Sequence, residues 1–139
     1  KTILTLANAM DVGAPSNLER LKAMFTNWSA AQAKTRAMSV SDSAIRKTIK
    51  SAEKKWGFLP CPHTATALFV REKLGDGPWI VVATAHPAKF ETVVEPLIKR
   101  SIQVPSALRE ILSRIPRTPR SKTILPSLKA LKKALVRLT

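Results

Sequence analysis

Hydrophobic positions along the 139-residue chain follow two kinds of spacing. Short runs of apolar and β-branched residues at 2–7, 37–41 and 78–85 predict strands. The last run, PWIVVATA, is apolar almost throughout, which is typical of a strand buried on both faces of a parallel sheet. Between and after these runs, apolar residues recur at helical spacing. Strands that alternate with helices predict an α/β layer architecture.

Two of the expected helices begin at serine or aspartate caps. Ser16 and Glu19 have the spacing of a capping box, which predicts a helix start. Ser41 or Asp42 can cap the second helix, and Gly57 ends it. The expected apolar faces are Leu18, Leu21, Phe25 and Trp28 in the first helix, and Ile45, Ile49, Ala52 and Trp56 in the second.

Prolines predict where the remaining helices begin, because proline suits the first turn of a helix. Pro62, Pro87, Pro105 and Pro126 each precede apolar residues at helical spacing, and Gly75 ends the helix that Pro62 starts. A loop is expected at 116–123. The expected inward faces, in chain order, are Ala65, Leu68, Phe69 and Leu74; Phe90, Val93, Val94 and Leu97; Leu108, Ile111 and Leu112; and Leu128, Leu131, Leu135 and Leu138.

Thr84 is the first candidate site residue, because it lies at the carboxyl end of the predicted strand 78–85. In α/β folds, ligands bind beyond this end of the strands. The alternative is that its hydroxyl caps the helix that begins at Pro87 or bonds to the backbone. The residues alone leave both possibilities open and place a candidate pocket around 60–66 and 84–87.

The charge distribution raises the question of an anionic partner. The chain has a formal net charge of +15. Residues 1–98 contain 13 basic and 8 acidic residues, whereas residues 99–139 contain 11 basic residues and one acid, Glu110. Such a tail can contact nucleic acid or anionic lipid, or it can be a solvated surface. Because it contains no aromatic residue that could stack on bases, we favour the solvated surface.

Several classes of protein are excluded or disfavoured by composition. The single cysteine, Cys61, excludes an internal disulfide framework and favours an intracellular, cytoplasmic setting. Cys61 and His63 have no second Cys/His pair to complete a zinc site, so we expect no metal. No apolar run is long enough for a membrane span. The chain starts without methionine or a signal peptide, which suggests a piece of a longer protein.

Three segments of the chain, in this order, resemble threonine synthase. They are ANAMDVGAPSNLERL at 7–21, CPHTATALFV at 61–70 and IVVATAHPAKFETVVEPLI at 80–98. The most specific part is Ala-Thr-Ala-His-Pro-Ala-Lys-Phe, which is similar to a signature of the family's bacterial and fungal type. The tail, which includes VPSALREIL, also resembles the family but is more basic than we expect.

The resemblance implies a fold, an activity and a cofactor. The family has the tryptophan-synthase-like fold of pyridoxal-phosphate enzymes (fold type II), with short parallel strands and packed helices. It converts O-phosphohomoserine and water to threonine and phosphate. By resemblance, Thr84 is the partner of the pyridine nitrogen of pyridoxal 5'-phosphate. His63 and Thr64 are implied to line the cofactor pocket, directly or behind a contacting residue, and His86 to be a pocket wall or a structural residue.

The family's Schiff-base lysine and its Gly-rich phosphate loop have no match in this sequence, so no catalytic residue is assigned. We therefore expect a C-terminal fragment that needs the missing N-terminal part and is inactive alone. Residues 1–100 would belong to the cofactor-binding α/β region and 101–139 to a basic helical tail. Backbone N–H groups in the loop from Asp11 to Asn17 are candidates to face an anion. Two alternatives remain: a related enzyme with another phospho-substrate, and a basic nucleic-acid-binding module.

Overall fold

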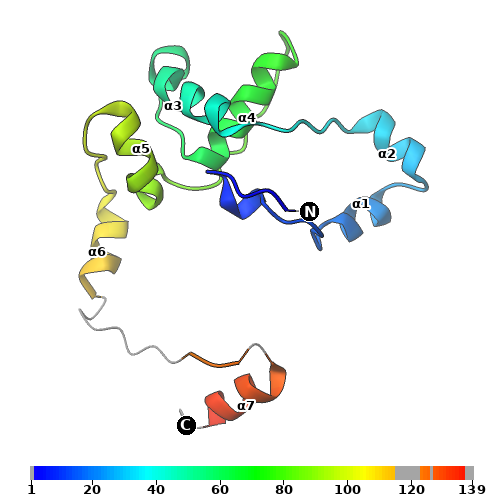
Figure 1. Cartoon of the computed structure of the whole chain (residues 1–139). Coiled ribbons are helices and arrows are strands. Elements are labelled where there is room, and N and C mark those ends of the chain that lie inside the picture. Colours follow the sequence, from blue (N-terminus) through cyan, green and yellow to red (C-terminus); the bar gives the residue numbers. More distant parts are fainter. Residues whose placement is uncertain (1, 115–122, 126, 137–139) are drawn as a thin grey trace. The chain divides into compact units, whose positions relative to one another are not determined.

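The computed structural model describes residues 2–114, 123–125 and 127–136 and contains two compact units, Lys1–Gln103 and Val104–Thr139 (Figure 1). The elements of the first unit are η1 (Asn8–Met10), α1 (Leu18–Met24), α2 (Trp28–Lys34), α3 (Asp42–Trp56), α4 (Pro62–Lys73), η2 (Pro87–Phe90) and α5 (Glu91–Ile98). Those of the second unit are α6 (Ser106–Arg114) and α7 (Leu128–Val136).

Helix α3 begins and ends as its sequence predicts. The Ser41 hydroxyl accepts a hydrogen bond from the Ala44 N–H at 3.3 Å, which satisfies one of the unpaired donors of the first turn. Gly57 ends the helix with a φ of 74°, a left-handed conformation that glycine adopts without steric cost. The expected inward residues Ile45, Ile49 and Ala52 are buried.

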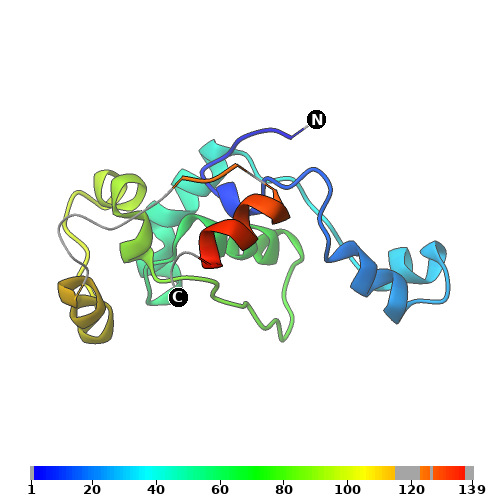
Figure 2. The ribbon, with the colours of Figure 1, turned by 90° about the horizontal axis from the view of Figure 1, so that it is seen from below.

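Helix α4 packs against α3 (Figures 1 and 2), and its first residues belong to the longest run of buried residues among those that the structure describes. Pro62 occupies its first turn, and every residue from Pro60 to Ala65 is buried. The core of the first unit forms where these two helices meet α5 and the N-terminal segment. Its buried members are Ala7, Ile45, Ile49, Ala65 and Val94.

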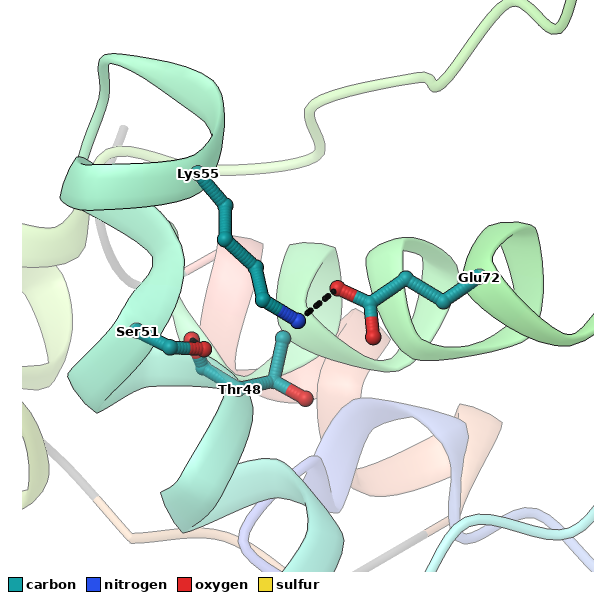
Figure 3. A network of polar contacts seen from close by, with 4 residues as sticks. All are labelled: Thr48, Ser51, Lys55 and Glu72. Carbon is teal, nitrogen blue, oxygen red and sulfur yellow. Dashed lines mark hydrogen bonds and ion pairs between the residues drawn. The ribbon is translucent and has the colours of Figure 1, made fainter. Parts of the chain in front are cut away.

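One ion pair joins the outer faces of α3 and α4 (Figure 3). The Lys55 ammonium lies 2.9 Å from a Glu72 carboxylate oxygen, and both side chains are partly exposed. Exposed pairs of this kind contribute about 0 to 1 kcal/mol, because water screens the charges. The apolar core, not this pair, therefore holds the two helices together.

The three predicted strands are absent from the part of the chain that the structure describes. Residues 37–41 and 78–85 run without a bridge to any described neighbour. In 2–7, the Leu6 N–H donates to Asp42 and the Thr5 N–H to Asp11, so side chains replace a strand partner. A strand needs a neighbour to pair its backbone, and here none is present. The expected short parallel strands are thus not seen.

The run 78–85 shows this most clearly, because its apolar side chains face water. Ile80 is 92% exposed and Val82 is 70% exposed. The run crosses between α4 and η2 as an extended segment (Figure 1). The expectation of burial on both faces is therefore wrong for the described chain.

The capping box at Ser16 also does not form. Helix α1 starts one residue later than expected, with Asn17 as an N-cap that makes no side-chain bond. The chain then turns at Phe25, and α2 restarts where the Asn27 side chain accepts from the Ala30 N–H at 2.9 Å. The one expected helix is therefore two short helices, of which α1 buries no residue.

The helices of the second unit form near the positions that their sequence predicts. Helix α6 follows Pro105, and α7 begins at Leu128. Their expected inward residues Ile111, Leu112 and Leu131 are exposed, because the described part of this unit presents no partner surface to them. Leu138 and residues 116–122 of the expected loop lie outside the described residues. Within the described ranges, no helix is long and apolar enough to cross a membrane.

His63 joins the N-terminal segment to α4. Its Nε2 accepts a hydrogen bond from the Ala9 N–H at 3.1 Å, and its ring lies against Phe90 with the centroids 4.9 Å apart. Only a neutral imidazole can accept this bond. Burial lowers the pKa of His63 below its usual 6.5, and the Asp11 carboxylate opposes this in part. The contact is therefore made by the neutral ring.

We expect Ile49→Ala to lower the free energy of unfolding of the chain by about 2 to 5 kcal/mol, because it leaves a cavity between α3 and α4. The matched control is Lys50→Ala on the exposed face of the same helix, which should change the free energy of unfolding by about 0.5 kcal/mol or less. Urea unfolding followed by circular dichroism measures both. Equal effects of the two changes would contradict the described core.

A second prediction concerns pH. The unfolded chain protonates His63 at its usual pKa of 6.5, whereas the folded chain resists protonation. The unfolded state then binds more protons, so the free energy of unfolding falls as pH drops below about 6.5. His63→Gln should remove this slope below about pH 6.5, and His86→Gln should retain it. An unchanged slope in the His63 variant would refute the contact with Ala9.

Candidate functional site

A pocket of about 690 Å³ lies where the end of α3, the start of α4 and the segment before η2 meet. Three of the predicted site residues line it, namely Thr64, Thr84 and His86. Phe58 and Leu59 add an apolar wall, and Arg100 adds a charge. The pocket therefore combines a hydroxyl, an imidazole and apolar surface, which is the usual composition of a small-molecule site.

Thr84 lies at the rim of this pocket with its side chain exposed. Its backbone N–H donates to the Thr64 hydroxyl at 3.3 Å, and its own hydroxyl lies 3.8 Å from the Cys61 sulfur. The cap of the following helix is not Thr84 but His86, whose Nδ1 accepts from the Ala88 N–H at 3.1 Å. The hydroxyl of Thr84 is thus not used as a cap.

Cys61 is a member of this cluster that the sequence did not identify. Its sulfur caps α4 by accepting from the Thr64 N–H at 3.5 Å and also lies 3.3 Å from the Thr64 hydroxyl. Burial alone would raise the pKa of the thiol, but hydrogen bonds from Thr64, Thr84 and the backbone outweigh it, so the pKa lies below the usual 9.0. The available signal was the spacing of Cys61 and Thr64, which is that of a helix cap and its receiving residue.

His86 and Arg100 occupy different parts of the pocket wall. Because His86 Nδ1 accepts a hydrogen bond, the neutral ring carries its proton on Nε2 and is a donor there. Arg100 pairs with Glu53 in an exposed ion pair. Arg100 was not singled out from the sequence, because nothing local distinguishes it from the other basic residues of the tail.

Two other predicted positions lie outside the pocket lining. His63 contacts Ala9 and Phe90 and does not line the pocket. In the loop from Asp11 to Asn17, Asp11 accepts from both the N–H and the hydroxyl of Thr5, at 2.6 and 2.8 Å. The loop leads into α1, a helix of seven residues. Asp11 therefore closes a local turn of the N-terminal segment.

A larger groove of about 1090 Å³ lies along the extended segments near Leu4, Met38 and Ile80. None of the cofactor-site residues expected from the sequence lines it. Its size comes from exposed apolar side chains of segments without a strand partner. We therefore place the candidate site in the smaller pocket, where the polar groups converge. No group of three or more metal-ligating residues occurs among the residues that the structure describes.

The chain is similar to known threonine synthases in sequence. The family model described as threonine synthase, C-terminal, matches residues 63–135. Threonine synthase from Buchnera aphidicola of Acyrthosiphon pisum is 37% identical over 111 residues, covering 78% of this chain and 26% of that protein. The enzyme of Escherichia coli K12 is 32% identical over 111 residues, again covering 78% of this chain and 26% of its own length. The chain thus spans about a quarter of these relatives.

Solved structures give the same result over nearly the whole chain. The crystal structure of threonine synthase from Escherichia coli aligns with a TM-score of 0.80 and 29% identity, covering 99% of this chain and 32% of that one. The PLP-bound threonine synthase from Brucella melitensis aligns with a TM-score of 0.68 and 25% identity, covering 99% and 35%. The three segments that suggested this resemblance are confirmed as a guide to the family. The chain belongs to the threonine synthase family and corresponds to its C-terminal region.

Proposed function

We propose that this chain is the C-terminal part of a threonine synthase and forms one wall of its cofactor pocket. The observation that carries the proposal is the exposed Thr84 hydroxyl at the rim of the 690 Å³ pocket. The complete enzyme would be a carbon–oxygen lyase that converts O-phosphohomoserine and water to threonine and phosphate. Because the chain spans about a quarter of its relatives, the activity needs the rest of the enzyme.

The pocket residues fit one edge of pyridoxal 5'-phosphate. The pyridine nitrogen of this cofactor is an acceptor when unprotonated, and Thr84 offers a neutral hydroxyl that can donate to it. When bound, the cofactor supplies an electron sink for carbanion chemistry. The described pocket wall contains no lysine and no glycine, so the Schiff-base lysine and phosphate loop must come from elsewhere in the complete enzyme.

The residues of this chain then have distinct tasks. Thr84 donates a hydrogen bond and, unlike an aspartate, does not hold the pyridine nitrogen protonated. Phe58 and Leu59 exclude water from one side of the pocket. His86 presents a donor at Nε2, which can hold an anionic oxygen of the cofactor or substrate. Thr64 acts from behind Thr84, because it is only 1% exposed.

The extended segments fit the same proposal. The run 78–85 has the composition of a strand in a parallel sheet, yet Ile80 is 92% exposed. We infer that it pairs with a sheet in the remainder of the enzyme, which places Thr84 at the end of a paired strand. Residues 1–100 would thus belong to the cofactor-binding region and 101–139 to the basic helical tail. The family match extends to residue 135, so most of this tail is part of the same family domain.

The isolated chain should neither retain pyridoxal phosphate nor release phosphate from O-phosphohomoserine. The reason is that it supplies no covalent lysine to the pocket. The test is absorbance near 400 nm after dialysis, together with a phosphate assay. Retained absorbance with turnover would contradict the proposal. The matched control is a chimera in which this chain replaces the C-terminal region of the Escherichia coli enzyme; both signals should appear there.

The second test replaces the matching C-terminal region of the Escherichia coli enzyme by this chain and measures kcat, KM and the cofactor spectrum. Thr84→Val keeps the shape but removes the donor, which costs on the order of 1 to 3 kcal/mol, or roughly ten- to a hundredfold in rate. Thr84→Ser should retain most of the rate. Thr84→Asp should be worse than valine, because its carboxylate would hold the pyridine nitrogen in the protonated form.

Two outcomes would count against the proposal. Wild-type turnover in the valine variant would show that Thr84 does not contact the cofactor. An active chimera that releases phosphate from a different phospho-substrate, and not from O-phosphohomoserine, would favour the related enzyme with another substrate. The parent enzyme, cut and rejoined at the same position with its own C-terminal region, controls for the junction.

A further inference from the structure

Cys61, Thr64 and Thr84 form a polar cluster that joins the first turn of α4 to the extended segment before η2. The Cys61 sulfur lies 3.3 Å from the Thr64 hydroxyl and 3.8 Å from the Thr84 hydroxyl. Cys61 is 0% exposed and Thr64 is 1% exposed, whereas Thr84 is exposed. The buried side chains of Cys61 and Thr64 therefore contact the exposed Thr84 at the pocket.

The donors and acceptors of this cluster favour one direction for these contacts. The Thr64 oxygen accepts from the Thr84 backbone N–H at 3.3 Å. A hydroxyl also has one proton to donate, and among the described residues the acceptor within reach of Thr64 is the Cys61 sulfur. A buried hydroxyl proton without an acceptor is costly, so Thr64 donates to the sulfur. The thiol proton of Cys61 is then free to be donated to the Thr84 oxygen, which lies 3.8 Å from the sulfur.

We propose that Cys61 and Thr64 are positioning residues that fix the Thr84 hydroxyl as a donor directed into the pocket. Thr64 holds the Thr84 backbone, and the Cys61 thiol donates to a lone pair of the Thr84 oxygen. The proton of Thr84 is then available to an acceptor in the pocket. This inference rests on the proposed role of Thr84 toward the pyridine nitrogen, and it adds what orients that hydroxyl.

Deprotonation of Cys61 reverses the arrangement. A thiolate accepts hydrogen bonds from both hydroxyls, so the Thr84 proton turns away from the pocket. The lowered pKa of Cys61 agrees with this, because hydrogen bonds from Thr64 and Thr84 stabilise the thiolate against the effect of burial. The other titratable side chains that line this pocket are Glu53, His86 and Arg100.

The first experiment uses the 139-residue chain itself. Cys61 is its only cysteine, so labelling cysteine with ¹³C at Cβ gives one signal whose shift with pH reports the thiol pKa. Thr84→Val should raise that pKa by roughly 0.5 to 1 pH unit, the effect of one lost hydrogen bond. Thr66→Val is the control, because its hydroxyl bonds to the His63 carbonyl and not to Cys61. An unchanged titration in Thr84→Val would overturn the proposal.

Thr64 is tested by a pair of variants in the same assay. Thr64→Val should also raise the pKa of Cys61, and Thr64→Ser should restore it, because serine keeps the hydroxyl. Because Thr64 is buried, Thr64→Val could fail to fold. In that case the test is decided by Thr84→Val, because the Thr84 side chain is exposed and its replacement leaves the core intact. A serine variant that titrates like the valine variant would count against the role of the hydroxyl.

The second experiment uses the chimera with the Escherichia coli enzyme. Cys61→Ala should lower kcat about three- to tenfold with little change in KM, and Cys61→Ser should recover most of it because serine still donates. Equal kcat in the alanine and wild-type chimeras would overturn the positioning role. A Thr84→Val change that shifts the Cys61 titration but leaves the chimera unaffected would instead refute the proposed role of Thr84 toward the cofactor.

Discussion

The burial of the first turn of α4 is the constraint on which the rest of the first unit depends. Residues from Pro60 to Ala65 are all buried, and Ala65 packs into the core beside Ile45, Ile49 and Val94. This packing fixes both the start of the helix and its rotation. Because consecutive helical residues point in different directions, one turn places His63 toward Ala9 and Thr64 toward Thr84. The N-terminal segment and the pocket are thus positioned by the same turn.

The features that the sequence predicted correctly are those determined by neighbouring residues. Ser41 caps the start of α3, Gly57 ends this helix, and Pro62 occupies the first turn of α4. Caps and prolines are predictable because they act within one turn. Thr84 was singled out from its place at the end of an apolar run and from a family motif. It lies at a pocket, and its role toward a cofactor stays a prediction. The same local reasoning failed at Ser16, where a correct capping-box pattern was not used by the chain.

The features that sequence reasoning missed depend on distant residues. Cys61 and Thr84 are 23 positions apart, and no local sequence pattern predicts a contact between a thiol and a hydroxyl at that separation. His63 was grouped with the pocket because it lies in the same family motif as Thr64, either as a contact or behind one. It does not line the described pocket and bonds to Ala9, 54 positions away, so its role toward the cofactor stays a prediction. The strand predicted at 78–85 is not seen for a different reason: apolar composition indicates that a segment can pair in a sheet, but pairing needs a neighbouring strand, and the described chain offers none.

The largely exposed run from Ile80 to Val82 also affects how the isolated chain behaves in solution. An extended apolar segment with unpaired backbone groups is a template for pairing with a copy of itself. Pro78 and Pro87 lack the N–H donor of a ladder and flank this segment, which limits the length that could pair. The net charge of +15 adds repulsion between copies, and salt screens that repulsion. We therefore expect the isolated chain to aggregate less at low ionic strength than at high ionic strength.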